Sequence, residues 1–108
     1  MICCYWYSLG GNQEGRGCRV YSDYGSQELF AWARTHGVPQ QWMLSTAEGL
    51  LHFDLFGSML SKLPPPESRN DVDEAGYQDA LAKAQELRQA RLRQKMSRWG
   101  LNARGRRR

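Results

Sequence analysis

The sequence predicts an α+β fold, with a small mostly antiparallel sheet and two short helices, followed by a long C-terminal basic α-helix. Two observations predict it. Short aromatic and apolar segments alternate with glycine-rich connections over residues 1–63. From residue 74 onward the chain consists mainly of Ala, Leu, Gln, Glu, Lys and Arg, which all favour helix. With 108 residues, 41% of them hydrophobic, the chain has room for one domain with a modest core.

The first elements are two short strands. Residues 2–7 are aromatic and apolar, and residues 18–22 ("CRVYS") have the same character, so each predicts a strand. The segment between them, "LGGNQEGRG", predicts a loop because it is rich in glycine. It lacks the Gly-Lys-Ser/Thr ending of a phosphate-binding loop.

A helix is predicted from Ser26 to His36. Asp23 or Ser26 can supply the oxygen that caps its start. Its end is marked by Gly37, which tolerates the left-handed conformation, and by Pro39, which prevents continuation.

Two further strands are predicted in "QWMLST" and "GLLHFDL", joined by a hairpin turn with Gly49 at the position of positive φ. One amphipathic helix over residues 42–55 is the alternative that the pattern leaves open. The following "GSMLSKL" predicts a second short helix, capped by Ser58 or Asp54.

The remainder divides into three parts. Residues 64–73 are rich in proline and acidic residues and predict a hinge, so the compact domain is expected to span residues 1–63. Residues 74–99 predict the long helix, and residues 100–108 a flexible Arg-rich tail. Basic residues interrupt the apolar side of the helix in its second half, so we expect the first half alone to pack on the domain.

An E-L-x-x-x-A-x-x-x-G-x-x-x-x-W segment starts at Glu28 and is followed by "HFDL" from His52. Through these motifs, residues 18–63 resemble a family of small uncharacterised bacterial and phage proteins. That family usually begins with an acidic strand, where this chain has "ICCYWYS". The resemblance implies a fold and a bacterial or phage origin, and it implies no reaction.

Charge divides the chain into an acidic body and a basic end. Residues 1–82 hold five basic and ten acidic residues, whereas residues 83–108 hold ten basic residues and one acidic residue. Such asymmetry favours an interaction arm, and nucleic acid or a nucleoprotein is the partner we expect. The predicted contact residues are Arg88, Arg91, Arg93, Lys95, Arg98, Trp99, Arg104, Arg106, Arg107 and Arg108.

Two alternatives accompany this prediction. The basic helix and tail can simply be a solvated, solubilising end of the chain. The protein can also be a phage-encoded inhibitor that binds a host protein complex through its acidic body. The residues predicted for that role are Asp23, Glu28, Glu48, Asp71, Asp73 and Glu74.

His52 and Asp54 are the catalytic candidates. Two positions apart on a strand, they share one face, as an imidazole and its orienting carboxylate must. The chain supplies no nucleophile motif beside them, so we expect a non-enzymatic protein without a cofactor and assign no catalytic residue.

Cysteine and tryptophan carry weaker signals. Cys3, Cys4 and Cys18 have no zinc-site spacing and are expected to be reduced thiols, with metal ligation alongside His36 or His52 as the alternative. Trp6, Trp32 and Trp42 are expected in the core. No apolar run approaches the roughly 20 residues of a membrane helix, and no signal peptide is recognisable. The expected location is the cytoplasm of a bacterial host cell, and the oligomeric state is left open.

Overall fold

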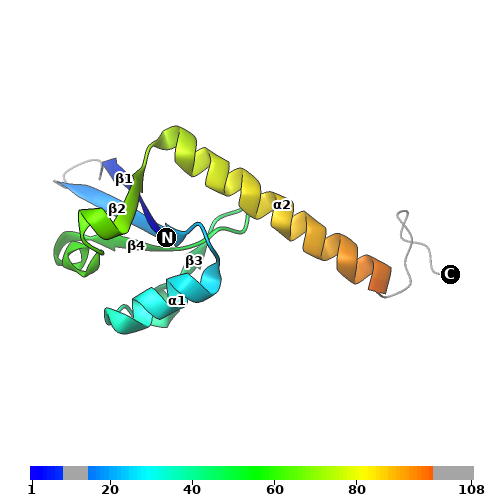
Figure 1. Ribbon diagram of the computed structural model, residues 1–108, viewed down its shortest axis with the longest axis horizontal. Helices are drawn as coiled ribbons and strands as arrows, with labels where there is room; N and C mark the ends of the chain where they lie inside the picture. The colour runs from blue at the N-terminus through cyan, green and yellow to red at the C-terminus, as the bar shows by residue number, and fades with distance from the viewer. Residues whose placement is uncertain (9–14, 99–108) are drawn as a thin grey trace.

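A single mixed sheet with a helix on each face forms the folded body. The computed structural model describes residues 1–8 and 15–98, with Arg98 described by its backbone only. This arrangement confirms the predicted α+β class (Figure 1). The described elements are β1 (Ile2–Ser8), β2 (Arg16–Ser22), α1 (Ser26–Thr35), β3 (Leu44–Ser45), β4 (Leu51–Phe56), β5 (Arg69–Val72) and α2 (Glu74–Arg98), with three 3₁₀ turns, η1 (Gln40–Trp42), η2 (Gly57–Lys62) and η3 (Pro66–Ser68).

The strand order is β3-β4-β2-β1-β5. All neighbours are antiparallel except β5, which runs parallel to β1 and pairs Ile2 with Arg69. Because side chains alternate along each strand, β1, β2 and β4 each contribute to both faces of the sheet. The two faces therefore carry two separate apolar clusters.

The larger cluster lies between the sheet and α1. Val20 and Phe53 from the sheet are fully buried there, and Leu29, Trp32 and Ala33 of α1 pack onto them. These three helical positions lie one turn apart or adjacent, which gives α1 a single apolar side. Residues of η2 close the edge of this cluster. The predicted short helix α1 thus exists because one of its sides is buried.

The smaller cluster lies between the opposite face and the first half of α2. Tyr77 and Leu81 are buried there against Cys3 and Tyr21, with Ala80 and Ala84 partly buried. Beyond Ala84 the helix extends away from the body (Figure 1). As predicted, the apolar packing of α2 on the domain is confined to its first half, although Arg88 still contacts the β3–β4 turn.

Helix α1 ends as predicted and begins differently. Gly37 has a φ of 70°, and the N–H of Val38 donates to the carbonyl of Ala33 at 2.9 Å, which closes the last turn. The predicted cap by Asp23 or Ser26 is wrong. Gly25 occupies the cap position, and no side chain caps the helix.

The hairpin alternative for residues 42–55 is confirmed and the helix alternative is wrong. β3 and β4 are antiparallel, and Gly49 takes a φ of 97° in the turn, where its N–H donates to the carbonyl of Thr46 at 2.9 Å. The first strand is shorter than predicted, because Trp42 lies in η1.

The second short helix is a 3₁₀ turn, η2, and its predicted capping is wrong. Neither Ser58 nor Asp54 caps it, since no side chain bonds to its start. Asp54 belongs to β4 and points to the opposite face of the sheet, where Arg19 binds it.

The segment 64–73 is not the expected hinge. It contains η3 and β5, and β5 adds an edge strand beside β1. Asp71 lies within this strand, and Asp73 then caps α2 by accepting the Gly76 N–H at 2.8 Å. The sheet therefore extends past residue 63, and α2 is joined to it by a single residue. None of the helices described is long and apolar enough to cross a lipid bilayer.

Candidate functional site

His52 and Asp54 share the α2-facing side of β4, as their spacing predicts. His52 is only 3% exposed, and its Nδ1 lies 3.2 Å from the carbonyl oxygen of Leu50. Its Nε2 lies 3.6 Å from Asp54 Oδ2, which is too long for a hydrogen bond. The imidazole is therefore packed inside the fold.

Asp54 is bound by Arg19, a residue that the sequence analysis did not single out. Arg19 Nε and Nη2 donate to the two carboxylate oxygens of Asp54 at 2.9 and 3.1 Å. Burial raises the pKa of Asp54, but nearby His52 and the two bonds from Arg19 outweigh it and lower the pKa to about 2. Of these two neighbours, Arg19 has the better geometry, because both of its bonds are short and parallel.

The same arginine connects the sheet to α2. Arg19 Nη1 donates to the hydroxyl oxygen of Tyr77 at 2.7 Å. The ring of Tyr77 stacks on Tyr5 with centroids 4.2 Å apart, and the Tyr5 hydroxyl donates to Glu74 at 2.8 Å. This network fixes the start of α2 on the sheet, so the role that the geometry gives Asp54 is structural.

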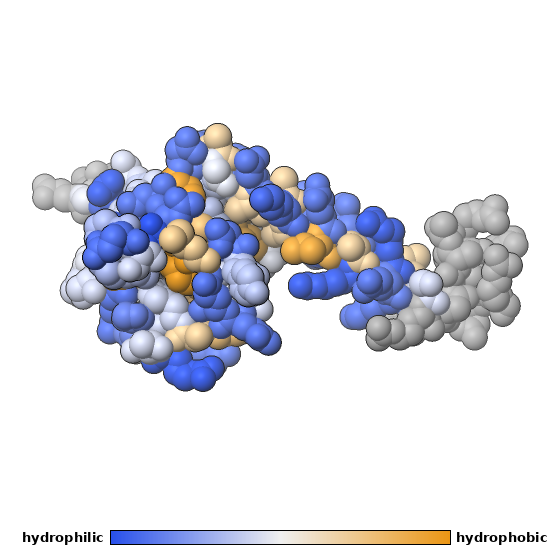
Figure 2. Space-filling view, in the orientation of Figure 1, coloured by the Kyte–Doolittle hydropathy of each residue, from blue (hydrophilic) through white to orange (hydrophobic). Residues whose placement is uncertain are grey.

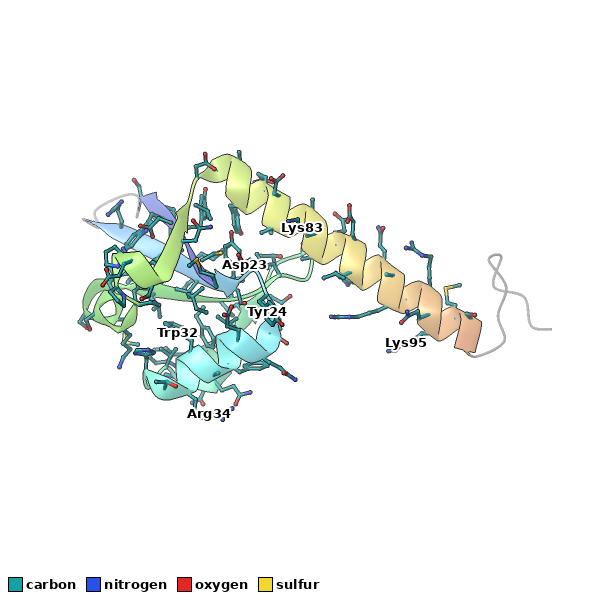
Figure 3. The ribbon with its side chains drawn as sticks, viewed as in Figure 1. Asp23, Tyr24, Trp32, Arg34, Lys83 and Lys95 are labelled. Atoms are coloured by element: carbon teal, nitrogen blue, oxygen red, sulfur yellow. The ribbon has the colours of Figure 1, made fainter. Side chains whose placement is uncertain are left out.

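The second half of α2 has a basic side that continues its buried side. Residues 88, 91 and 95 follow residues 77, 81 and 84 at helical spacing, so they lie in one line along the helix. Along this line, the side chains change from apolar to basic at the point where the helix leaves the sheet. Arg88 Nη1 donates to the carbonyl of Ala47 at 2.8 Å, and Figure 3 shows Lys95 on the side of α2 nearer the body.

Four exposed cations in the second half of α2 have no acidic partner among the described residues. Arg88, Arg91, Arg93 and Lys95 are all exposed. Within the described residues, no carboxylate lies at ion-pair distance from any of them. Figure 2 shows hydrophilic side chains over most of the projecting part of α2. These cations are therefore available to an external anion.

Comparison with protein-family models, curated proteins and solved structures found no match. The resemblance of residues 18–63 to a family therefore stays a prediction. The remaining predicted contact residues cannot be placed, because they lie outside the described side chains: Arg98, Trp99, Arg104, Arg106, Arg107 and Arg108.

Most of the acidic residues predicted for protein binding have partners inside the chain. Asp23 and Glu28 each lie 2.8 Å from the amino group of Met1. Asp71 accepts bonds from Arg69 and Trp6. Asp73 caps α2 and Glu74 accepts a bond from Tyr5, while Glu48 lies half-buried in the β3–β4 turn. Five of the six carboxylates therefore already have a hydrogen-bond or ion-pair partner within the chain.

A cleft between α1 and α2 was not foreseen from the sequence. It has a volume of about 580 Å³ and lies between the start of α1, from Tyr24 to Glu28, and Arg91 of α2. Tyr24 is 86% exposed beside it. The sequence signal for an exposed Tyr24 was its position in the polar segment "SDYGS" before a helix, where it has no apolar neighbours in sequence to pack against.

The three cysteines are free and buried, as expected for reduced thiols. Among the described residues, no cluster of His, Cys, Asp and Glu could hold a metal ion. The tryptophan prediction is correct only for Trp32, because Trp42 is exposed and Trp6 is partly buried. The ring of Trp6 lies 4.5 Å from the guanidinium of Arg16 and 5.5 Å from that of Arg69.

Proposed function

We propose that this protein is a non-enzymatic phage or bacterial accessory protein that binds nucleic acid, or a nucleoprotein, through the basic half of α2 and the Arg-rich tail. One observation carries the proposal. α2 leaves the sheet with exposed, unpaired cations, and the sequence then continues into four more arginines, Arg104, Arg106, Arg107 and Arg108. A folded body thereby presents a continuous basic arm.

The physical basis of such binding is electrostatic. Each phosphate neutralised by a cation releases counterions, so affinity falls steeply with added salt and depends little on base sequence. Nearly all cations of the arm are arginines, whose planar guanidinium suits phosphate oxygens and stacks on bases. The burial of His52 and the engagement of Asp54 by Arg19 support a structural role for the catalytic candidates.

Deleting residues 100–108 tests the proposal. The deletion removes four arginines, so we expect weaker binding to DNA and RNA and a salt dependence reduced by about three units, at roughly 0.7–0.9 per phosphate contact. Fluorescence polarisation with labelled oligonucleotides at a series of salt concentrations measures both quantities.

The control keeps the length of the tail and changes the four arginines to serine. It should behave like the deletion, because the proposal assigns the effect to charge. Unchanged affinity and salt dependence in both variants would overturn the proposed function.

A further inference from the structure

We propose that the cleft between the start of α1 and the projecting part of α2 is a binding site for single-stranded nucleic acid. One base stacks on Tyr24, and the adjoining phosphates contact Arg88, Arg91 and Lys95. This inference rests on the proposed function and adds where the strand lies and which form of nucleic acid fits.

The basic line on α2 is oriented toward the body. Arg88 contacts the β3–β4 turn through Ala47, and Arg91 forms one wall of the cleft. From residue 88 to residue 95 the line extends about 10 Å at 1.5 Å per residue, enough for a few successive phosphates. Two other cations of the helix, Lys83 and Arg93, lie away from this line by helical spacing.

Tyr24 has the properties of a stacking platform. Its side chain is 86% exposed, and within the described residues its ring pairs with no other aromatic ring. Its backbone is held, because the N–H groups of Tyr24 and Gly25 both donate to Ser22 Oγ at 3.0 and 3.1 Å. A base that stacks on this exposed ring causes no loss of loop entropy, because the backbone is already ordered.

The charge balance around the cleft favours an anion. Glu28 lines the cleft, but hydrogen bonds from the Met1 amino group and from Ser22, both to its Oε1, lower its pKa. Asp23 shares the same amino group, so the two carboxylates leave one uncompensated negative charge. Arg91 lines the cleft opposite them, and Arg88 and Lys95 lie in the same line of α2, so these three positive charges leave an excess of two.

The geometry discriminates between a single strand and a duplex. The cleft volume of about 580 Å³ lies within the range of about 300–1,000 Å³ that is typical of sites for small organic ligands, so a base has room beside Tyr24. Stacking needs a base whose face is uncovered, and bases in a duplex are covered by their neighbours. Figure 3 shows Tyr24 on the same side of α2 as Lys95.

The first experiment compares Tyr24→Ala with Tyr24→Phe in the full chain. The probes are one labelled oligonucleotide as a single strand and the same oligonucleotide as a duplex. Tyr24→Ala should weaken single-strand binding about five- to a hundredfold, and Tyr24→Phe should leave it unchanged because the ring remains. Duplex binding should change little in either variant. Both variants should unfold like the wild type, because Tyr24 is exposed.

The second experiment uses two charge-matched double variants. Arg91→Ala with Lys95→Ala removes two cations from the body-facing side of α2. Arg34→Ala with Lys83→Ala removes two exposed cations that lie outside this line and outside the predicted contact residues. The first pair should reduce the salt dependence of single-strand binding by about 1.4, at about 0.7 per phosphate contact, and the second should leave it almost unchanged.

The outcomes separate this inference from the proposed function. Three results would each overturn the proposed cleft site while leaving nucleic-acid binding intact. They are an equal loss of salt dependence in the two double variants, an unchanged single-strand affinity in Tyr24→Ala, and an equal effect of Tyr24→Ala on duplex binding. A wild-type chain that binds neither probe would overturn both.

Discussion

At the scale of single residues, the ion pair of Arg19 and Asp54 has the clearest energetic meaning. Arg19 holds Asp54 through two bonds and reaches Tyr77 with a third, and both partners of the pair are mostly buried. A partly buried, bidentate pair is stabilising as long as both charges remain, and removing one leaves the other without a partner.

This pair predicts a pH-dependent stability. The folded pKa of Asp54, about 2, lies below the unfolded value of about 3.9, so its contribution is fully present above pH 4 and is lost as pH falls toward 2. The contribution is about 2–3 kcal/mol, because each pKa unit corresponds to about 1.4 kcal/mol. We expect Asp54→Asn to lower the free energy of unfolding by at least about that amount at pH 7, and the difference from wild type to shrink between pH 4 and pH 2.

Urea titrations across this pH range measure the effect. Asp79→Asn is the matched control, since Asp79 is exposed on α2 and forms no ion pair with any described residue. A constant difference between wild type and Asp54→Asn down to pH 2 would contradict the assignment.

At the scale of elements, α2 is one helix with two environments. Leu81 lies 9% exposed in the cluster against the sheet, whereas Leu87 is 59% exposed beyond it. Tertiary packing stabilises the first half, and the second half depends on helix propensity and on continuity with the first.

The same substitution at these two leucines tests the division. Leu81→Ala should lower the free energy of unfolding by about 2–3 kcal/mol, because it leaves a cavity and exposes apolar surface. Leu87→Ala should change it by less than about 0.5 kcal/mol. Chemical denaturation of both variants gives the comparison, and similar costs at the two positions would show that the helix packs along its whole length.

The elements also show which parts of the fold the sequence could predict. The end of α1 was predictable because Gly37, Val38 and Pro39 act locally. β5 was not, since three of its four residues, "RNDV", are polar and its pairing with β1 joins distant parts of the chain. The face shared by His52 and Asp54 followed from strand alternation, but their partner Arg19 depends on the register between β2 and β4. The exposure of Tyr24 arises only from tertiary packing.

At the scale of the whole molecule, the projecting helix makes the shape elongated. The radius of gyration is 17.0 Å, compared with about 13 Å for a compact chain of this length. The greatest extent is 57 Å against 31 and 25 Å in the other directions. The body and the basic arm therefore occupy different regions of space.

Truncating the chain after residue 86 should remove the basic arm and leave the folded body. It keeps Tyr77 and Leu81, so we expect it to remain folded, and its radius of gyration should fall toward about 12 Å. It should also lose nucleic-acid binding, because all nine predicted contact cations of the arm are removed with it. Small-angle scattering and circular dichroism measure compactness and fold, and loss of the folded state on truncation would show that the second half of α2 stabilises the body.

The parallel pairing of β5 with β1 bears on the order in which the chain folds. β1 meets β2 and β2 meets β4 through comparatively short connections, but β1 meets β5 only by bringing residues 2 and 69 together. Such distant contacts form late, because closing the long loop between them costs conformational entropy, which the contact offsets only after it has formed. During synthesis, one edge of β1 therefore stays unpaired until β5, which is made much later. Since α2 starts one residue after β5, it is the last element to reach its place.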